Sequence, residues 1–273
     1  MTSRGFLGGP GAYPVRQVTP AQALGWLARG WADLRRCPLP GLLHGAAAAL
    51  FGLVVVWQFH DHFWLLAGAF SGFLIVAPLL ATGLYAVSRA LERGEQAGMA
   101  DAVGIWCSLD RRLMHFGLLL ALAGTGWVIT SAALVTGFAD VPIDSPLDFL
   151  RRVVLAPDSW LFEAWLMLGA ALAAPVFASS VVAIPLLLDR RGEASTDVLR
   201  AVLTSWRAVE TNPVVMALWA ALLLALVLLA FATALLGLVV VVPWLAHASW
   251  HAYRDLVERD LVGPPAEPPA EPH

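Results

Sequence analysis

Long apolar stretches, separated by short polar segments, dominate the pattern of this chain. A bilayer core of about 30 Å needs about 20 apolar residues in a helix to cross it. Five stretches approach or exceed that length: Gly41–Gln58, Phe63–Val87, Leu113–Phe138, Trp160–Leu188 and Val214–Ala246. The pattern therefore predicts an all-α transmembrane bundle.

The last stretch, Val214–Ala246, is too long for one ordinary crossing, because as a single helix it would measure about 50 Å. We divide it into two spans, Val214–Thr233 and Leu236–Tyr253, joined by a tight turn around Ala234–Gly237. The chain is thus predicted to be a polytopic bundle of about six spans.

Three amphipathic segments precede the odd-numbered spans. They are Thr19–Arg36, Met99–Arg112 and Ser195–Glu210. In the first, Thr19 is a suitable helix cap and Pro20 suits the first helical position. Each segment has arginine on its polar side and one tryptophan on its apolar stripe, namely Trp31, Trp106 and Trp206. Such helices lie in the membrane interface with the apolar face towards the lipid.

The even-numbered spans also share a feature, a proline near the cytoplasmic end. These prolines are Pro78, Pro185 and Pro243. One interpretation is a threefold repeat of interfacial helix, span and proline-bearing span. The other is coincidence, because proline in spans and tryptophan at interfaces are common in multi-span proteins.

Composition excludes a water-soluble protein. Hydrophobic residues make up 59% of the chain and charged residues 14%, and the mean hydropathy is +0.72. Soluble globular chains average about 45–50% apolar and about 25% charged residues. The formal net charge of −3 offers no basic field for nucleic acid, so the expected surroundings are the lipid bilayer.

The arginines predict the orientation in the membrane. All 17 basic residues are arginine, and with the N-terminus inside only Arg151 and Arg152 fall on the external side. This bias follows the positive-inside rule and predicts a bacterial inner-membrane protein with both termini in the cytoplasm. Residues 1–18 and 258–273 are rich in Gly, Pro or Glu and are expected to be disordered, which leaves 19–257 as the membrane domain.

Four histidines are expected near the cytoplasmic ends of the spans: His44, His115, His247 and His251. If they converge, neutral imidazoles are suitable ligands for a metal ion or haem. Histidines at span ends more often serve as interfacial hydrogen-bonding groups with a wet tip. No second ligand motif accompanies them, so we expect no cofactor and keep metal or haem binding as a minority hypothesis.

Residues 247–255 form the densest polar cluster of the predicted spans, with His247, His251 and Arg254 within about two helical turns. Polar groups at this depth are costly and tend to be partnered or functional. The cluster is either an anchor for the end of the last helix or a contact for a substrate or partner. No nucleotide-binding, hydrolase or metalloprotease motif occurs in the chain, so we expect a protein that is not an enzyme.

Residues 15–52, 211–223 and 241–257 resemble an uncharacterised prokaryotic family of six-span membrane proteins, domain of unknown function family 2189. The closing segment WLAHASWHAYRDLV is the most specific part. Some members carry the label putative cytochrome c oxidase, so the resemblance implies a link to a respiratory complex. A catalytic oxidase subunit needs histidine ligands deep in its bundle, and this chain has none in the middle third of a predicted span. The implied role is therefore accessory at most.

The leading hypothesis is an accessory or assembly component without enzymatic activity. It would bind a membrane-protein partner, or a second copy of itself, through its interfacial Trp/Arg helices. The alternative is a small-solute transporter or channel, which the internal repetition and the proline-bearing spans suggest.

Overall fold

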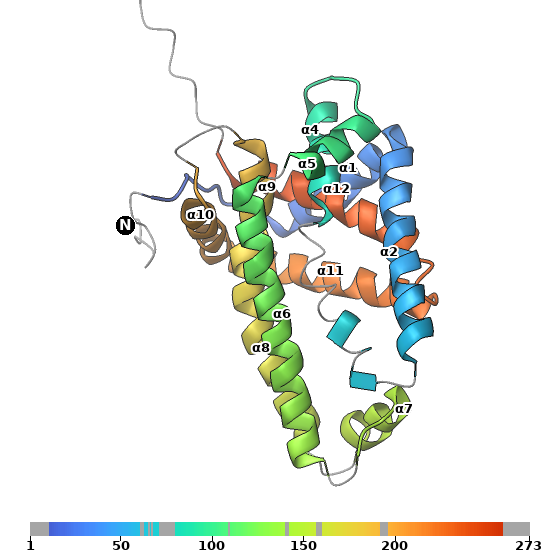
Figure 1. The fold of residues 1–273 in the computed structure, drawn as a ribbon. Helices are drawn as coiled ribbons and strands as arrows, with labels where there is room; N and C mark the ends of the chain where they lie inside the picture. The colour runs from blue at the N-terminus through green and yellow to red at the C-terminus, as the bar shows by residue number, and fades with distance from the viewer. Residues whose placement is uncertain are drawn as a thin grey trace, which may run out of the picture.

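A computed structural model describes residues 11–60, 63, 64, 66, 68–70, 80–108, 110–139, 142–156, 160–191 and 196–258. These residues fold almost entirely into helices, and none of them belongs to a β-strand (Figure 1). The predicted all-α class is therefore confirmed.

The described residues form helices along most of their length. In chain order they are α1 (Pro20–Arg36), α2 (Pro38–Phe59), α4 (Thr82–Glu92), α5 (Met99–Cys107), α6 (Arg111–Phe138), α7 (Pro146–Phe149), the π-helical turn η1 (Leu150–Val154), α8 (Leu161–Ser180), α9 (Ala183–Asp189), α10 (Val198–Thr211), α11 (Pro213–Ala232) and α12 (Leu238–Leu256).

Among the described residues, four helical segments are long and apolar enough to cross a membrane: α2, α6, α8 continued into α9, and α11. They cover the first, third, fourth and fifth predicted spans. The second predicted span, Phe63–Val87, lies partly outside the described residues, and α12, which covers the sixth, is not one of the four. A helical membrane bundle is confirmed, whereas the count of six spans stays a prediction.

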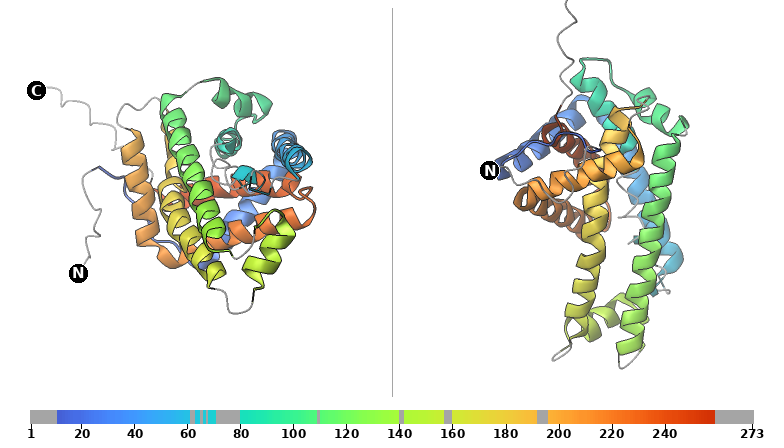
Figure 2. Two further views of the ribbon diagram at one scale, coloured as in Figure 1. Left: turned by 60° about the horizontal axis from the view of Figure 1, so that its bottom comes forward. Right: turned by 90° about the vertical axis from the view of Figure 1, so that its left-hand side faces the viewer.

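The long helices take two directions. α2, α6 and α8 run along the long dimension of the molecule, and α11 and α12 run across it (Figure 1). α6 and α8 lie side by side in all views (Figure 2). They are joined by a hydrogen bond of 2.7 Å from Trp165 Nε1 to Ser131 Oγ. The angle at which two helices cross depends on which of their faces meet, so periodicity in the sequence cannot predict these directions.

α11 and α12 are separate helices joined by a short turn, as the length of the apolar stretch predicts. In this turn Ala234 and Leu235 have φ angles of 52° and 69°, which is uncommon for residues other than glycine. Thr233 Oγ1 accepts a hydrogen bond of 2.8 Å from the backbone nitrogen of Gly237. Leu235 is buried in an apolar cluster with Ala49 of α2, which holds the turn in place. The predicted break between two helices is therefore confirmed, whereas the assignment of both helices as membrane spans stays a prediction.

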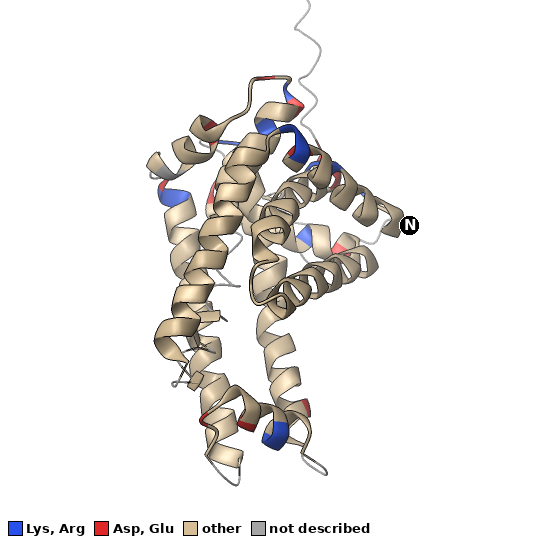
Figure 3. Cartoon of the chain, turned by 90° about the vertical axis from the view of Figure 1, so that its right-hand side faces the viewer, with Lys and Arg blue, Asp and Glu red and all other residues tan. Residues whose placement is uncertain are grey.

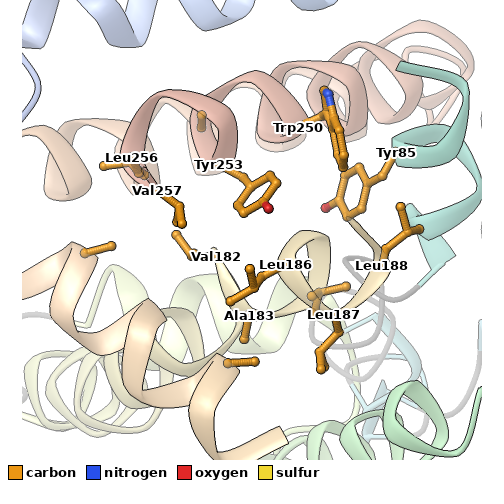
Figure 4. Close-up of a cluster of buried hydrophobic side chains, with 14 of the residues drawn as sticks. Tyr85, Val182, Ala183, Leu186, Leu187, Leu188, Trp250, Tyr253, Leu256 and Val257 are labelled. Carbon is orange, nitrogen blue, oxygen red and sulfur yellow. The ribbon is translucent and has the colours of Figure 1, made fainter. Parts of the chain in front are cut away.

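The main core lies where α4, α9 and α12 meet (Figure 4). Leu186 and Leu187 of α9 are completely buried, and Tyr85 of α4 and Trp250 of α12 belong to the same cluster. α4, α9 and α12 are the last helices of the three predicted repeat units, so these units meet at their ends. The threefold repeat itself stays a prediction.

One predicted amphipathic segment has the wrong bounds. Met99–Arg112 is not a single helix, because α5 ends at Cys107 and α6 begins at Arg111. Asp110 separates them: its carboxylate accepts a hydrogen bond of 2.9 Å from the backbone nitrogen of Arg112 and caps α6. An N-cap residue starts a new helix because its side chain satisfies a free backbone N–H group.

The prediction of disorder for residues 1–18 is wrong for residues 11–18. Tyr13 is buried, and its ring lies between two guanidinium groups, with Arg190 Cζ at 4.0 Å and Arg200 Cζ at 3.9 Å from the ring centroid. Val15 pairs with Val257 in an antiparallel bridge beside the end of α12. These cation–π and backbone contacts hold a segment whose composition alone indicates flexibility. Residues 1–10 and 259–273 lie outside the described part of the chain.

Candidate functional site

The last three turns of α12 gather polar side chains from four helices. We call this group the α12 hub: Asp33 of α1, Ser88 and Glu92 of α4, Asp189 of α9, and His247, His251, Arg254 and Asp255 of α12. The histidines and Arg254 are residues that the sequence singled out. Asp33, Ser88, Glu92 and Asp189 come from segments far away in the chain, whereas Asp255 follows Arg254 directly.

Asp33 is the centre of a buried hydrogen-bond network. Its Oδ2 atom accepts hydrogen bonds of 2.8 Å from Ser88 Oγ and 2.8 Å from His251 Nε2. Ser88 Oγ also lies 2.7 Å from His247 Nδ1. Asp33 is 6% exposed, and Ser88 and His247 are fully buried. These four side chains join α1, α4 and α12, and we refer to them as the Asp33 network.

The two bonds of Ser88 determine where the protons lie. An ionised carboxylate can only accept, so the single hydroxyl proton of Ser88 goes to Asp33. Ser88 then accepts from Nδ1–H of His247, and Nε2 of His247 carries a lone pair. Among the described residues this Nε2 atom has no hydrogen-bond partner. It lies against α2, where a Cβ built on Gly41 would be 3.8 Å away.

The environment of Asp33 favours its ionised form. Burial raises the pKa of this carboxyl, but the hydrogen bond and charge of His251, the hydrogen bond of Ser88 and the charge of His247 outweigh burial and lower the pKa below its ordinary value. A carboxylate that accepts several hydrogen bonds behaves in this way. Asp33 is therefore a buried anion whose charge depends on neighbouring histidines.

Arg254 forms the second part of the hub. Its guanidinium donates to Asp189 Oδ2 at 3.0 Å and to Glu92 Oε1 at 3.1 Å. Tyr253 OH also donates to Asp189 Oδ2, at 2.8 Å. The opposing charges of Glu92 and Asp189 outweigh burial and raise the pKa of Arg254. This arginine therefore links the ends of α4, α9 and α12.

Asp255 forms the third part of the hub, on the side of α12 that faces α1. Its carboxylate pairs with the guanidinium of Arg29 and accepts a hydrogen bond of 2.8 Å from Trp26 Nε1. Trp26 is fully buried and packs edge to face on Trp219 of α11. The hub thus connects the end of α12 to α1, α4 and α9.

The structure brings three of the four predicted histidines to one region and leaves the fourth apart. His44 of α2 is close enough to His247 to act on its charge, while its own Nδ1 lies 2.8 Å from the carbonyl of Pro40. His115 is exposed on α6. Within the described ranges, no group of three His, Cys, Asp or Glu side chains is arranged to hold a metal ion. The geometry favours hydrogen bonding over ligation at His247 and His251.

The predicted tryptophans have separate environments. Trp31 is 38% exposed and packs edge to face on Trp244, with ring centroids 5.4 Å apart. Trp206 is partly buried and donates from Nε1 to Ser179 Oγ at 2.9 Å. The side chain of Trp106 lies outside the described part of the structure.

Asp33 and Ser88 were not identified from the sequence. The signal for Asp33 is a second periodicity in α1, since Ala23, Trp26, Gly30 and Asp33 share one buried face. This face is less hydrophobic than the stripe that includes Trp31, so the apolar pattern alone indicates the other face. Ser88 carries no comparable signal in its own segment.

The charged side chains are distributed unevenly over the molecule. Most of the basic residues lie at the end that carries α4, α5 and α9, and those of η1 lie at the opposite end (Figure 3). The α12 hub belongs to the basic end, where arginine neutralises most of its carboxylates.

Residues 65–189 match the family described as predicted integral membrane protein, DUF2189. The matched family is the expected one, but residues 15–52, 211–223 and 241–257, on which the resemblance was based, lie outside the match. The match contains Ser88, Glu92 and Asp189 of the hub and none of the hub residues on α1 or α12. No curated protein and no solved structure matches the chain.

Proposed function

We propose that this integral membrane protein, whose residues 65–189 match the DUF2189 family, is a non-enzymatic accessory or assembly component of a larger membrane complex. We place it in a bacterial inner membrane with both termini in the cytoplasm, because the arginines concentrate at one end of the molecule (Figure 3). The expected neighbours are lipid and a membrane-protein partner, with no cofactor.

The observation that carries the proposal is that α1 and α10 each have one face packed on the bundle and one exposed face. α1 packs on the bundle through Trp26, Gly30 and Asp33, and α10 packs through Ala201 and Thr204. Each helix also has a large apolar side chain that points away from the bundle: Leu24 is 60% exposed, and Leu199 is 65% exposed. Aromatic and aliphatic side chains on an exposed face, beside arginine, are typical of membrane interfaces and of partner contacts.

The polar groups of the hub support a structural role for this end of the chain. His251 and Arg254 bond to acids of α1, α4 and α9. Groups engaged in this way hold helices together and do not present a reactive atom to a substrate. A position within a respiratory complex, which the family resemblance implies, is compatible with such a scaffold.

Site-specific photo-crosslinking in native membranes tests the proposal. A benzoylphenylalanine residue replaces Leu24, Trp31 or Leu199 in turn, and Met167, which is 73% exposed on the apolar helix α8, serves as the lipid-facing control. We expect one discrete protein adduct of the same size from the first three positions and lipid adducts alone from Met167. An adduct of twice the mass of the chain would identify a second copy as the partner. Lipid adducts alone at all four positions would contradict the proposal.

A second candidate function, transport of a small solute, is favoured by the break between α8 and α9. The helix stops at Ser180 and restarts at Ala183 inside an otherwise continuous apolar stretch. The backbone nitrogen of Val182 donates to Ser205 Oγ of α10 at 3.1 Å in a buried position. Interrupted helices of this kind occur in secondary transporters. Solute flux into vesicles that contain the purified protein, with empty vesicles as control, would support this function.

A further inference from the structure

The acids that fasten α12 to its neighbours have different partners. Glu92 and Asp189 pair with Arg254, and Asp255 pairs with Arg29. Asp33 pairs with His251 instead, at 2.8 Å, and within the described residues the hydrogen-bond partners of its carboxylate are His251 and Ser88. A guanidinium keeps its charge at all physiological pH values, whereas an imidazole gains and loses a proton in that range. The Asp33 junction is therefore the titratable contact of the hub.

The position of His247 gives this titration a structural consequence. Nδ1 of His247 is used by Ser88, so an added proton must go to Nε2, which is buried against α2 and has no acceptor among the described residues. A buried cation without a counter-charge or an acceptor is unfavourable. His247 and His251 are one helical turn apart, so their two positive charges would also repel each other. Positive charges on both histidines therefore disfavour the packing of α12 on α1 and α4.

We propose that Asp33, Ser88, His247 and His251 form a proton-binding site, and that a proton bound at His247 separates α12 from α1 and α4. The proton enters from solvent through the edge occupied by His251, whose side chain is 13% exposed. When one of the two histidines is protonated, ionised Asp33 balances its charge. When both are protonated, the second charge has no balancing charge, and α12 separates from α1 and α4.

The charged groups around the network do not supply the missing counter-charge. From α1, Arg29 faces Asp255. From α4 and α9, Glu92 and Asp189 face Arg254. α2 contributes His44, which adds positive charge when protonated, and α11 contributes no titratable side chain. The three other carboxylates of the hub are each paired with arginine, so within the hub Asp33 alone balances the histidines.

Hydrogen exchange of the full chain in lipid nanodiscs, measured by mass spectrometry from about pH 8 to about pH 4, tests this proposal. Each variant is compared with wild type at the same pH, so that the intrinsic pH dependence of exchange cancels. We expect acidification to lower the protection factors, which are the intrinsic exchange rates divided by the observed rates, in α1 and in the second half of α12 by about tenfold per pH unit for one linked proton.

Two variants are expected to shift the pH at which α12 separates from α1 and α4, in opposite directions. His247→Gln keeps an N–H donor for Ser88 but cannot take a proton, so opening shifts to lower pH. Asp33→Asn removes the balancing charge, so opening shifts to higher pH. His115→Gln, at the exposed histidine of α6, leaves the profile unchanged.

Shifts in the same direction, or no shift in His247→Gln, would overturn the proposal. If Asp33→Asn does not fold, the His247→Gln result decides alone. The outcome is independent of the partner contact proposed above, because the crosslinking positions Leu24 and Leu199 lie outside the Asp33 network.

Discussion

Gly30 of α1 lies directly against the backbone of Ala248 of α12: a Cβ built on the glycine would be 2.5 Å from the Ala248 nitrogen. The two helices thus touch backbone to backbone at this point. Such a close approach requires a residue without a side chain. It also brings Asp33, one turn further along α1, within hydrogen-bond distance of His251.

Gly30→Ala is therefore expected to lower the free energy of unfolding by about 1–3 kcal/mol, because the methyl group would force the helices apart. The measurement is thermal unfolding in mild detergent. Gly25→Ala is the matched control on the same helix, since nothing lies within 4 Å of a Cβ built there. The control should be slightly stabilising, by about 0.5–1 kcal/mol, because alanine favours a helix over glycine. Equal effects of the two substitutions would show that α1 does not pack on α12 in this way.

Arg254→Gln is expected to destabilise the protein by about 2 kcal/mol, because it leaves Glu92 and Asp189 without their shared cation in a half-buried site. Thermal unfolding by size-exclusion analysis of heated samples measures the loss. Arg152→Gln is the control, since Arg152 pairs with Asp148 at the exposed η1 turn. The control should melt at the wild-type temperature, and a comparable fall in both variants would argue against a central role for Arg254.

Tyr13→Ala is expected to lower the free energy of unfolding by about 3 kcal/mol, because it removes a buried ring from between Arg190 and Arg200. Tyr13→Phe keeps the ring and removes only the hydrogen bond with Thr196, so its cost should be about 1 kcal/mol. Proteolysis at the N-terminal segment, compared in the two variants, provides the local readout. Wild-type stability in Tyr13→Ala would mean that residues 11–18 are not held as described.

Asp110 is expected to make stability depend on acid pH. Burial raises the pKa of Asp110, but the hydrogen bonds and charge of Arg112 and the charge of Arg191 outweigh it, so the pKa lies below its ordinary value. The stabilisation is complete above about pH 4 and is lost as the pH falls through the lowered pKa. Asp110→Asn keeps a helix cap but has no charge to lose. Its melting temperature should be lower than that of wild type near neutral pH and should fall less on acidification; parallel pH profiles would exclude this contribution.

Local signals in the sequence predicted several features of the fold. Thr19 and Pro20 indicate the start of α1, which begins at Pro20. The length of the last apolar stretch indicates a turn around Ala234, where the φ angle is 52°. Both features depend on residues close together in the chain, and such local preferences act wherever the segment lies. Asp110 also carries a local signal, a capping residue before two arginines, but the predicted helix Met99–Arg112 extended across it and was wrong there.

The Asp33 network could not be predicted in the same way. Asp33 and His251 are 218 positions apart, and no periodicity relates them. Asp33 also lies away from the most hydrophobic stripe of α1, which is the feature that identifies an interfacial helix. Tyr13 illustrates the same limit: a segment rich in Gly and Pro is ordered by Arg190 and Arg200, whose approach is decided by the packing of distant helices.

In the proposed topology the apolar helices cross a bilayer with the arginine-rich end on the cytoplasmic side. Cysteine labelling in spheroplasts with a membrane-impermeant maleimide tests it most directly. In a chain with Cys37→Ser and Cys107→Ser, which removes the two free thiols, single substitutions Arg93→Cys and Arg151→Cys mark the exposed ends of the molecule. We predict labelling of Arg151→Cys in intact spheroplasts and of Arg93→Cys only after the membrane is permeabilised. Labelling of both positions in intact spheroplasts would contradict the account.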